Sequence, residues 1–478
     1  MIIKEIPYKD PVLLFETFRE RPFSFFLDSG MNAGRLGRYS LIGSDPFLVF
    51  KSKKDLVATW QDGVWQEWRR DPFAVLRELL DCCRAVTAPS VPVPVAAGAF
   101  GYFAYDLGRQ IEKLPDMAVD DLDVPDCYLG FYDRLVVFDH LAGKAYLTST
   151  GVTGNCGLST ERAQERMKEL EHLIVLPRQG NGSPKKLFEE MTTPHFTCHF
   201  TRRTYCEAVQ KVKDYIAAGD IFQANLSQRF SCQLSVSPWT LYRRLRMINP
   251  APFAAYLSYP ELVIASASPE RFLQVRGRQV ETRPIKGTRP RGKDPAEDLR
   301  LRTELLNSAK DRAELTMIID LERNDIGRVC TYGSVHVPEL ITLEEYPTVF
   351  HLVSTVRGTL APGRDLVDLL KATFPGGSVT GAPKIRAMEI IEELEPVKRG
   401  VYTGSIGYLG FDGSADLNIV IRTFIIKGGQ AYFQVGGGIV ADSDPEMEYW
   451  ESIHKGRALM HALGCREEVI PKCLGLPG

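Results

Sequence analysis

The stretch LVIASASPERFLQVRGRQVETRPIKGT, residues 262–288, decides the fold class of this 478-residue chain. Within it, apolar and β-branched residues gather in short runs that only a few turn-forming residues separate. Strands that follow one another so closely pair antiparallel, since a parallel connection needs a long crossover. The strands predicted in this half of the chain lie at 222–230, 262–267, 272–275 and 279–285, with a meander over 404–437.

Several amphipathic helices accompany these strands. In the first of them, Tyr205, Val209, Val212 and Ile216 recur at helical spacing, and the pattern stops at Gly219. Longer helices, which must pack on the sheets to bury their apolar sides, are predicted at 299–322, 383–394 and 446–463. We therefore predict an α+β fold, mostly antiparallel, rather than a doubly wound α/β fold.

The chain changes character near its first third. Hairpins are predicted over 56–68 and 131–147, and a helix follows at 160–176. The next stretch, 177–184, is rich in Pro, Gly and Ser, which indicates a surface connection. The predicted organisation is an N-terminal region (1–176), a linker (177–194), a C-terminal catalytic region (195–465) and a C-terminal tail (466–478).

Composition restricts the classes of partner. The chain carries a formal net charge of −2, so no overall positive field attracts nucleic acid or an anionic membrane. No stretch resembles a secretory signal or reaches the length of a membrane span. Its ten cysteines include no C-x-x-C pair, which favours reduced packing residues. We expect a cytoplasmic protein whose partners are small molecules or other proteins.

Lys286 is the best candidate for a nucleophile. It lies between Pro284 and Gly287, at the end of an apolar stretch. Neighbouring positive charge together with partial burial would lower its pKa towards a neutral, reactive amine. The neighbouring cations are Arg283, Arg289, Arg291 and Lys293. For this segment alone, the alternative is a basic surface loop that binds nothing.

Two of the predicted helices carry pairs of acids three residues apart. This spacing places both members of a pair on one helix face. Because the pairs border apolar residues, their carboxylates need a cation, and Mg²⁺ suits such an all-oxygen set. The four acids are Asp311, Glu314, Glu448 and Glu451. The alternative for each pair is a solvated helix face.

Three further features suit anionic oxygens. The segment 376–384 leads into a helix with Pro383 near its first turn, which leaves N–H groups facing a ligand. The glycines at 436–438 let another group approach the backbone. Arg422 sits in an apolar run, where its charge needs a partner, either an anionic ligand or Asp416. Further donors are expected from His351, Tyr408 and Lys455.

One motif match is rejected. Residues 287–294, GTRPRGKD, fit G-x-x-x-x-G-K but end in Asp294, where a phosphate-binding loop needs a Ser or Thr hydroxyl for Mg²⁺. An acid at that position repels phosphate. A nucleotide hydrolase of this type is therefore only a secondary alternative.

Four motifs in one order resemble the chorismate-utilising enzymes, over about residues 25–463. They are PIKGTRPRG (284–292), DLERNDIGR (320–328), TGAPK (380–384) and GGIVADS (437–443). The resemblance implies two helix-flanked sheets, with Mg²⁺ bridging the ring carboxylate of chorismate to Glu314 and Glu451, and with Asp311 and Glu448 supporting them. It implies Lys286 and His351 as catalytic residues. The residues implied to bind substrate are Gln223, Gly287, Thr288, Thr380, Tyr408, Arg422, Gly437 and Lys455, of which Arg422 and Tyr408 would hold the enolpyruvyl carboxylate.

Within this family, the residue at position 286 distinguishes the branches. Anthranilate synthase component I has alanine there, whereas aminodeoxychorismate synthase component I has lysine. The segments DLGR (106–109) and NLSQR (225–229) also resemble the latter, and Gln223 replaces the lysine base of isochorismate synthases. The resemblance therefore implies amination of chorismate at C4, in which Lys286 adds at C2 before ammonia attacks C4. Anthranilate synthase is the alternative.

The product, 4-amino-4-deoxychorismate, leads to 4-aminobenzoate and folate. The chain shows no glutaminase nucleophile motif, so ammonia is expected from a separate glutamine amidotransferase subunit.

The N-terminal region of this family can hold tryptophan, and the matching residues here are Asp28, Ser29 and Pro250. Asp28 stands where the feedback-inhibited branch has glutamate, and Ala254 where that branch has methionine, so tryptophan control is not expected. A structural tryptophan is left open. A catalytically inactive ligand sensor is disfavoured because all four acids are present.

Overall fold

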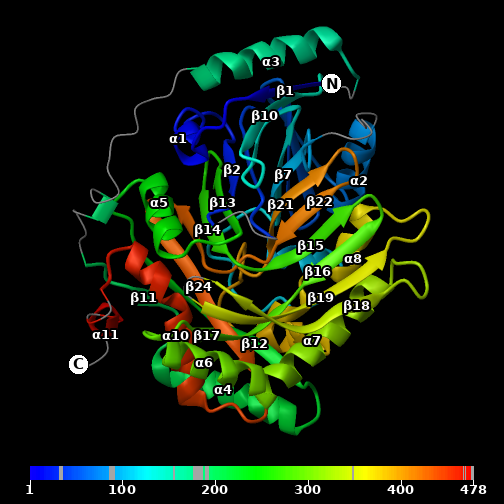
Figure 1. The fold of residues 1–478 in the computed structure, drawn as a ribbon. Helices are drawn as coiled ribbons and strands as arrows, with labels where there is room; N and C mark the ends of the chain where they lie inside the picture. Colours follow the sequence, from blue (N-terminus) through cyan, green and yellow to red (C-terminus); the bar gives the residue numbers. More distant parts are fainter. Residues whose placement is uncertain are drawn as a thin grey trace.

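The computed structural model describes residues 1–31, 36–84, 92–153, 157–175, 187–188, 193–346, 349–466, 468 and 470–474. In this part of the chain, two antiparallel sheets of twelve strands each pack face to face, and helices cover their outer sides (Figure 1). Neither sheet closes into a barrel. The predicted α+β class is confirmed. None of the described helices combines the length and the apolar character that a bilayer crossing requires.

The first sheet has the strand order β1 (Ile2–Ile6), β10 (Lys144–Ser149), β9 (Arg134–Asp139), β3 (Tyr39–Gly43), β2 (Phe25–Asp28), β13 (Phe253–Ser258), β14 (Val263–Ser268), β23 (Thr423–Lys427), β24 (Gln430–Ile439), β12 (Gln223–Gln233) and β11 (Thr197–Cys198), with β20 (Gly381–Ala382) on β12. The second has the order β17 (Ile285–Pro290), β19 (Val349–Thr359), β16 (Gln279–Arg283), β15 (Arg271–Arg276), β22 (Ala415–Asn418), β21 (Ser405–Gly410), β7 (Gly98–Phe103), β8 (Cys127–Tyr132), β4 (Leu48–Lys53), β5 (Leu56–Gln61) and β6 (Val64–Arg69), with β18 (His336–Glu345) on β19. The helices are α1 (Pro11–Phe15), α2 (Pro72–Cys83), α3 (Thr160–Val175), α4 (Arg202–Ala217), α5 (Pro238–Ile248), α6 (Pro295–Asn307), α7 (Ala309–Gly327), α8 (Leu366–Thr373), α9 (Lys384–Leu394), α10 (Pro445–Ala462) and α11 (Ile470–Cys473), with short 3₁₀ helices η2 (Tyr105–Gln110) and η4 (Gly377–Val379).

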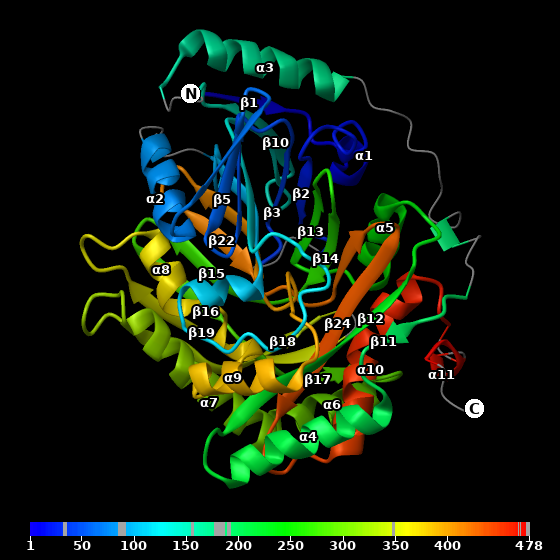
Figure 2. The same cartoon turned by 180° about the vertical axis from the view of Figure 1, so that it is seen from behind.

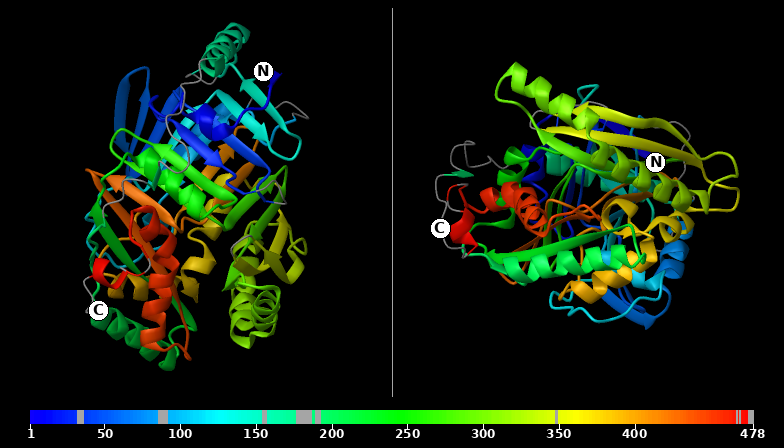
Figure 3. Two further views of the ribbon diagram at one scale, coloured as in Figure 1. Left: turned by 60° about the vertical axis from the view of Figure 1, so that its left-hand side comes forward. Right: turned by 90° about the horizontal axis from the view of Figure 1, so that it is seen from below.

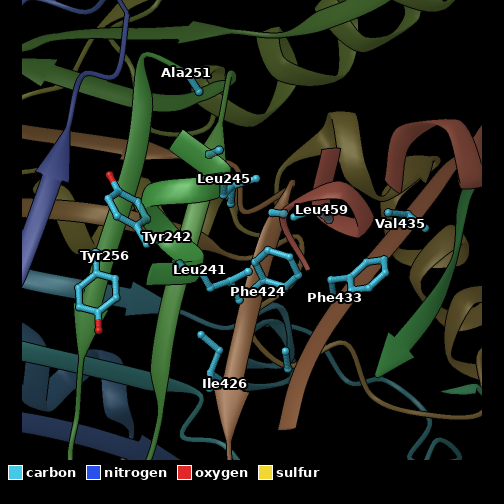
Figure 4. Close-up of a cluster of buried hydrophobic side chains, with 14 of the residues drawn as sticks. Leu241, Tyr242, Leu245, Ala251, Tyr256, Phe424, Ile426, Phe433, Val435 and Leu459 are labelled. Carbon is cyan, nitrogen blue, oxygen red and sulfur yellow. The ribbon is translucent and has the colours of Figure 1, made fainter. Parts of the chain in front are cut away.

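Three hydrophobic cores hold these layers together. The central core lies between the sheets, where Phe25 of β2 stacks on Phe100 of β7 with ring centroids 4.4 Å apart. A second core joins the first sheet to α5 and α10 and includes Tyr242, Phe424 and Leu459 (Figure 4). A third core joins the second sheet to α2, α7 and α8. Both sheets therefore bury apolar side chains on both faces, which fixes the layers that carry the site.

Both sheets run across the predicted boundary between the N-terminal and C-terminal regions. In the first sheet β2 pairs with β13 through Asp28 and Ala254, and in the second β7 pairs with β21 through Gly101 and Gly407. The two predicted regions thus share both sheets. Most of the predicted linker, 177–194, lies outside the described residues.

Three predictions need correction. The helix predicted at 299–322 is two helices, α6 and α7, because Ser308 caps α7 by accepting a hydrogen bond from the backbone N–H of Asp311 at 3.2 Å. Arg422 lies between β22 and β23, not inside a strand, and has φ +51°. Cys82 is disulfide-bonded, so the prediction of reduced cysteines is wrong for this residue.

The helices that carry the predicted acids lie in the lower half of the molecule. There α10 packs beside α4 and against β24, as the view from behind shows (Figure 2). Turned to the side, the molecule has α10 in red and α7 in yellow-green on either side of this lower half (Figure 3). The predicted acids thus come from two helices far apart in the sequence.

Candidate active site

The position of Lys286 follows from a β-bulge in β17. The pairing of β17 with β19 shifts register between Lys286 and Thr288, and Gly287 between them has φ +78°. A Cβ at Gly287 would come within 2.9 Å of the Asp311 Cβ and of Leu305 Cδ1. Glycine therefore suits both the backbone conformation and the close approach of α7, and the bulge re-aims the residues beside it.

Lys286 is half-buried, and its amine donates a hydrogen bond to the backbone carbonyl of Ser378 at 3.3 Å. Burial lowers its pKa, and the positive charge of Lys455 acts in the same direction. The carboxylates of Glu314, Glu270 and Glu451 partly oppose this shift. The predicted direction of the pKa shift is thus confirmed.

The predicted cause of this shift is wrong in part. The arginines near Lys286 in the sequence are each paired with acids: Arg283 with Glu344, Arg289 with Glu304 and Asp311, and Arg291 with Asp298. The cation that acts on Lys286 instead comes from α10, far away in the sequence. A basic surface loop that binds nothing is also excluded, because Lys286 faces the acids.

Glu270 is a site residue that the sequence analysis missed. It is only 5% exposed, and it lies directly before β15. Burial raises the pKa of Glu270 to about 7, against the opposing effects of the Ser378 hydroxyl and the Lys286 charge. It therefore exchanges a proton near neutral pH, next to the candidate nucleophile. A single acid after Ser-Pro in a turn gives no sequence signal that separates it from a surface acid.

A second buried acid, Glu322 of α7, stands close enough to Glu270 to interact with its charge. Burial raises the pKa of Glu322 well above its ordinary value, and the Thr282 hydroxyl donates a hydrogen bond to it at 2.9 Å. This pair adds negative potential behind Glu270 and favours its protonated form.

The predicted acids of α10 meet at Gly437 of β24. A Cβ at Gly437 would lie 3.2 Å from Lys455 Nζ, 3.4 Å from Glu448 Oε2 and 3.7 Å from Glu451 Oε1. Lys455 Nζ contacts Glu451 at 2.8 Å and donates to the Gly436 carbonyl at 3.0 Å. The absence of a side chain at Gly437 thus leaves the backbone open in front of two carboxylates and one amine.

The carboxylates of α7 and α10 interact with one another. Burial raises the pKa of Glu314, and the charges of Asp311 and Glu451 raise it further. Burial also raises the pKa of Glu448, whereas Lys455 lowers that of Glu451. Mutually repelling carboxylates are the donor set that a divalent cation stabilises. Among the described residues, no three acidic, histidine or cysteine side chains stand close enough to coordinate one ion, so Mg²⁺ would have to draw Glu314 and Glu451 together.

Arg422 and His351 form a second part of the site. Arg422 is half-buried, donates to the Asn249 side chain at 2.8 Å, and has no acidic side chain within ion-pair distance in the described part of the chain. Asp416, its predicted alternative partner, pairs with Arg271 instead. Burial and the Arg422 charge lower the pKa of His351 to about 3, so the imidazole is neutral and shares a 2.8 Å hydrogen bond with Thr288. A neutral histidine beside an unpaired arginine suits an anionic ligand.

Other predicted substrate-binding residues lie in different places. The Thr380 hydroxyl donates to the backbone carbonyls of Gly376 and Gly377, so it stabilises the turn before β20. Tyr408 is not beside Arg422; it lines a separate cavity together with Asp28 and Ser29, where burial raises its pKa. Gln223 of β12 is buried, with its amide against Gly438.

This separate cavity has a volume of about 300 Å³ and lies between β2, β13 and β21. Asp28 contributes to its wall, but its carboxylate already accepts hydrogen bonds from Tyr242 at 2.9 Å and Ser40 at 3.3 Å and pairs with Arg246. Pro250, predicted as a wall residue, is not among those that line the cavity, whereas Pro252 is.

Known proteins share this arrangement over almost the full chain. Residues 25–461 match the family model described as chorismate binding enzyme. The chain is 42% identical over 469 residues to aminodeoxychorismate synthase component 1 of Bacillus subtilis (strain 168), with 97% of each chain covered. It is 44% identical over 458 residues to anthranilate synthase component 1 of Thermus thermophilus, with 96% of each covered. The crystal structure of anthranilate synthase component I from Streptococcus pneumoniae TIGR4 is similar with a TM-score of 0.78 at 34% identity, covering 90% of this chain and 94% of that one.

Proposed function

This chain belongs to the chorismate-binding enzyme family, and from that premise we propose that it is the chorismate-aminating component of an aminodeoxychorismate synthase. The observation that carries the proposal is the pairing of a half-buried amine, Lys286, with a buried acid, Glu270, that titrates near neutral pH. An amine with a lowered pKa supplies a nucleophile, and an acid with a raised pKa supplies a proton.

The reaction divides into two displacements. In the first, Lys286 Nζ forms a bond to C2 of chorismate, the two ring double bonds shift, and the C4–O bond breaks; Glu270 supplies the proton with which the hydroxyl leaves as water. In the second, ammonia forms the C4–N bond, the double bonds shift back, and the bond between C2 and Lys286 breaks. The product is 4-amino-4-deoxychorismate.

The remaining site residues bind and orient the substrate. Arg422 takes the enolpyruvyl carboxylate, and the neutral His351 with Thr288 supplies uncharged hydrogen bonds beside it. The backbone at Gly287 and Gly437 and the amine of Lys455 face the other oxygens. Glu314 and Glu451, supported by Asp311 and Glu448, would hold Mg²⁺, which when bound neutralises the ring carboxylate and draws electron density towards it.

The similarity to anthranilate synthase of Thermus thermophilus supports a second candidate, amination at C2 to give anthranilate. Lys286 argues against it, because a primary amine directed at the ring would occupy the carbon that ammonia must reach in that reaction. The ammonia source is proposed to be a separate glutamine amidotransferase subunit, in keeping with the name component 1 of the relatives. Glutamine alone should then give no product with this chain, whereas ammonium should.

Product analysis tests the proposal. The purified chain is incubated with chorismate, Mg²⁺ and an ammonium salt, and the products are separated by chromatography. We expect 4-amino-4-deoxychorismate; anthranilate would establish the second candidate, and isochorismate would indicate attack by water. Lys286→Ala should lower the rate by roughly 10³-fold or more, because the covalent route is lost. Lys286→Arg keeps the charge and should be equally impaired, so full activity of either variant would refute the covalent role.

A further inference from the structure

Two buried amide oxygens next to the site have no hydrogen-bond donor among the described residues. They are Oε1 of Gln223 and Oδ1 of Asn225, whose side chains are 1% and 7% exposed. A buried acceptor without a donor costs free energy, so it marks a place where a ligand or water completes the hydrogen bonding. The segment NLSQR, which the sequence analysis singled out, contains Asn225 and has no other role in the proposed reaction.

Both oxygens face one side of the same strand. Gln223 and Asn225 are two residues apart on β12, so their side chains point to the same face. The Gln223 amide occupies the space above Gly438, the residue that pairs with Asn225; a Cβ at Gly438 would lie 1.9 Å from Gln223 Nε2. The glycine therefore brings the two side chains to one spot of the wall.

This spot adjoins Lys286 through the turn before α9. The backbone N–H of Asn225 donates to the Thr380 carbonyl at 2.8 Å, and β20 pairs with β12 at Gln223. Two residues before Thr380, the Ser378 carbonyl accepts the hydrogen bond from Lys286 at 3.3 Å. One short segment thus contacts the nucleophile on one end and the two acceptors on the other.

The chemistry of the two acceptors selects their ligand. Each is an uncharged amide oxygen that accepts but does not carry a negative charge. The carboxylate farther along the strand, Glu395, is already bonded to Ser227 and Arg399. A carboxylate would favour ammonium, which has no lone pair for attack, whereas neutral acceptors hold neutral ammonia through its N–H groups and leave its lone pair free.

We propose that Gln223 and Asn225 form the position that holds ammonia for its attack on C4. This inference rests on the proposed amination and adds the residues that position the second substrate. It assigns them no contact that chorismate needs for binding, so the two substrates separate their effects.

Steady-state kinetics with ammonium as the nitrogen source tests this. Asn225→Leu and Gln223→Met remove the acceptors at nearly constant volume. Each should raise the KM for ammonia about tenfold, the effect of one lost hydrogen bond, with the KM for chorismate changed less than about twofold. Gln434→Met is the matched control, because Gln434 Oε1 is also buried and without a donor among the described residues but lies near Arg229, farther along β12; its KM for ammonia should be unchanged.

The outcomes separate the two proposals. The identity of the product reports on the amination chemistry, whereas the ratio of the two KM values reports on Gln223 and Asn225. An unchanged KM for ammonia in both variants, with the product still aminated, would show that these oxygens bind only water. A rise in the KM for chorismate alone would show that they bind the ring instead. Either result would overturn the inference while the proposed function stands.

Discussion

At the scale of single residues, Lys286 and Glu270 set each other's protonation because they are buried next to one another. The amine must be neutral to attack, so kcat/KM should fall as the pH falls through its lowered pKa. The acid must be protonated to donate, so kcat/KM should also fall as the pH rises through about 7. The expected profile is a bell whose alkaline limb belongs to Glu270, measured as kcat/KM for chorismate at saturating ammonia.

Glu270→Gln checks this assignment in two ways. The variant should lose most of its activity, since an amide donates no proton. It should also be more stable than the parent at pH 8: burial raises the Glu270 pKa from 4.5 to about 7, so the parent loses stability as the pH rises through this interval. The gain in free energy of unfolding should approach ~3 kcal/mol at pH 8 and vanish near pH 4. An inactive variant with no gain in stability would mean that Glu270 is already charged in the folded protein.

At the scale of elements, the bulge in β17 links the nucleophile to the acid-bearing helix. Gly287→Ala forces a side chain into a left-handed conformation and against Asp311 and Leu305. We expect a loss of about 1–3 kcal/mol in the free energy of unfolding, measured with denaturant, and a large loss of activity, because α7 and Lys286 must shift apart. Gly277→Ala is the control: Gly277 has φ +59° but nothing within 4 Å of its Cβ position, so it should cost about 1 kcal/mol and leave activity intact. Equal activity in both variants would show that the bulge does not position Lys286.

The elements also show what could be predicted from sequence. Strands and helices with strong local patterns, such as the helix at 160–176 and the hairpin at 56–68, appear within a residue or so of their predicted bounds. Ser308 was missed as a helix boundary, because a capping serine inside a helical pattern differs little from a surface serine. Glu270 and the role of Lys455 were missed because both depend on contacts between segments far apart in the sequence. Tyr408 was misplaced for the same reason: its strand runs past Arg422 to a different cavity.

At the scale of the whole molecule, the separate cavity and the site are joined by one segment. Asn249 accepts the hydrogen bond from Arg422 at 2.8 Å, and two residues later the Ala251 carbonyl accepts from the backbone N–H of Gly30, beside the cavity residue Ser29. A ligand that displaced this segment would therefore also displace Arg422. This gives the fold a physical route by which the cavity could act on chorismate binding.

Tryptophan should nevertheless leave the activity unchanged. An amino-acid ligand needs a carboxylate for its ammonium group, and Asp28 is already engaged by Arg246, Tyr242 and Ser40. Binding would have to break these buried contacts, which costs more than an exposed ion pair returns. Initial rates with chorismate and ammonium, with and without millimolar tryptophan, should agree within about twofold. Asp28→Asn gives the contrasting case: it leaves Arg246 without its acid, which should destabilise the fold but create no inhibition. Strong inhibition of the parent by tryptophan would show that the ligand recruits Asp28 away from Arg246 and moves Arg422 through Asn249.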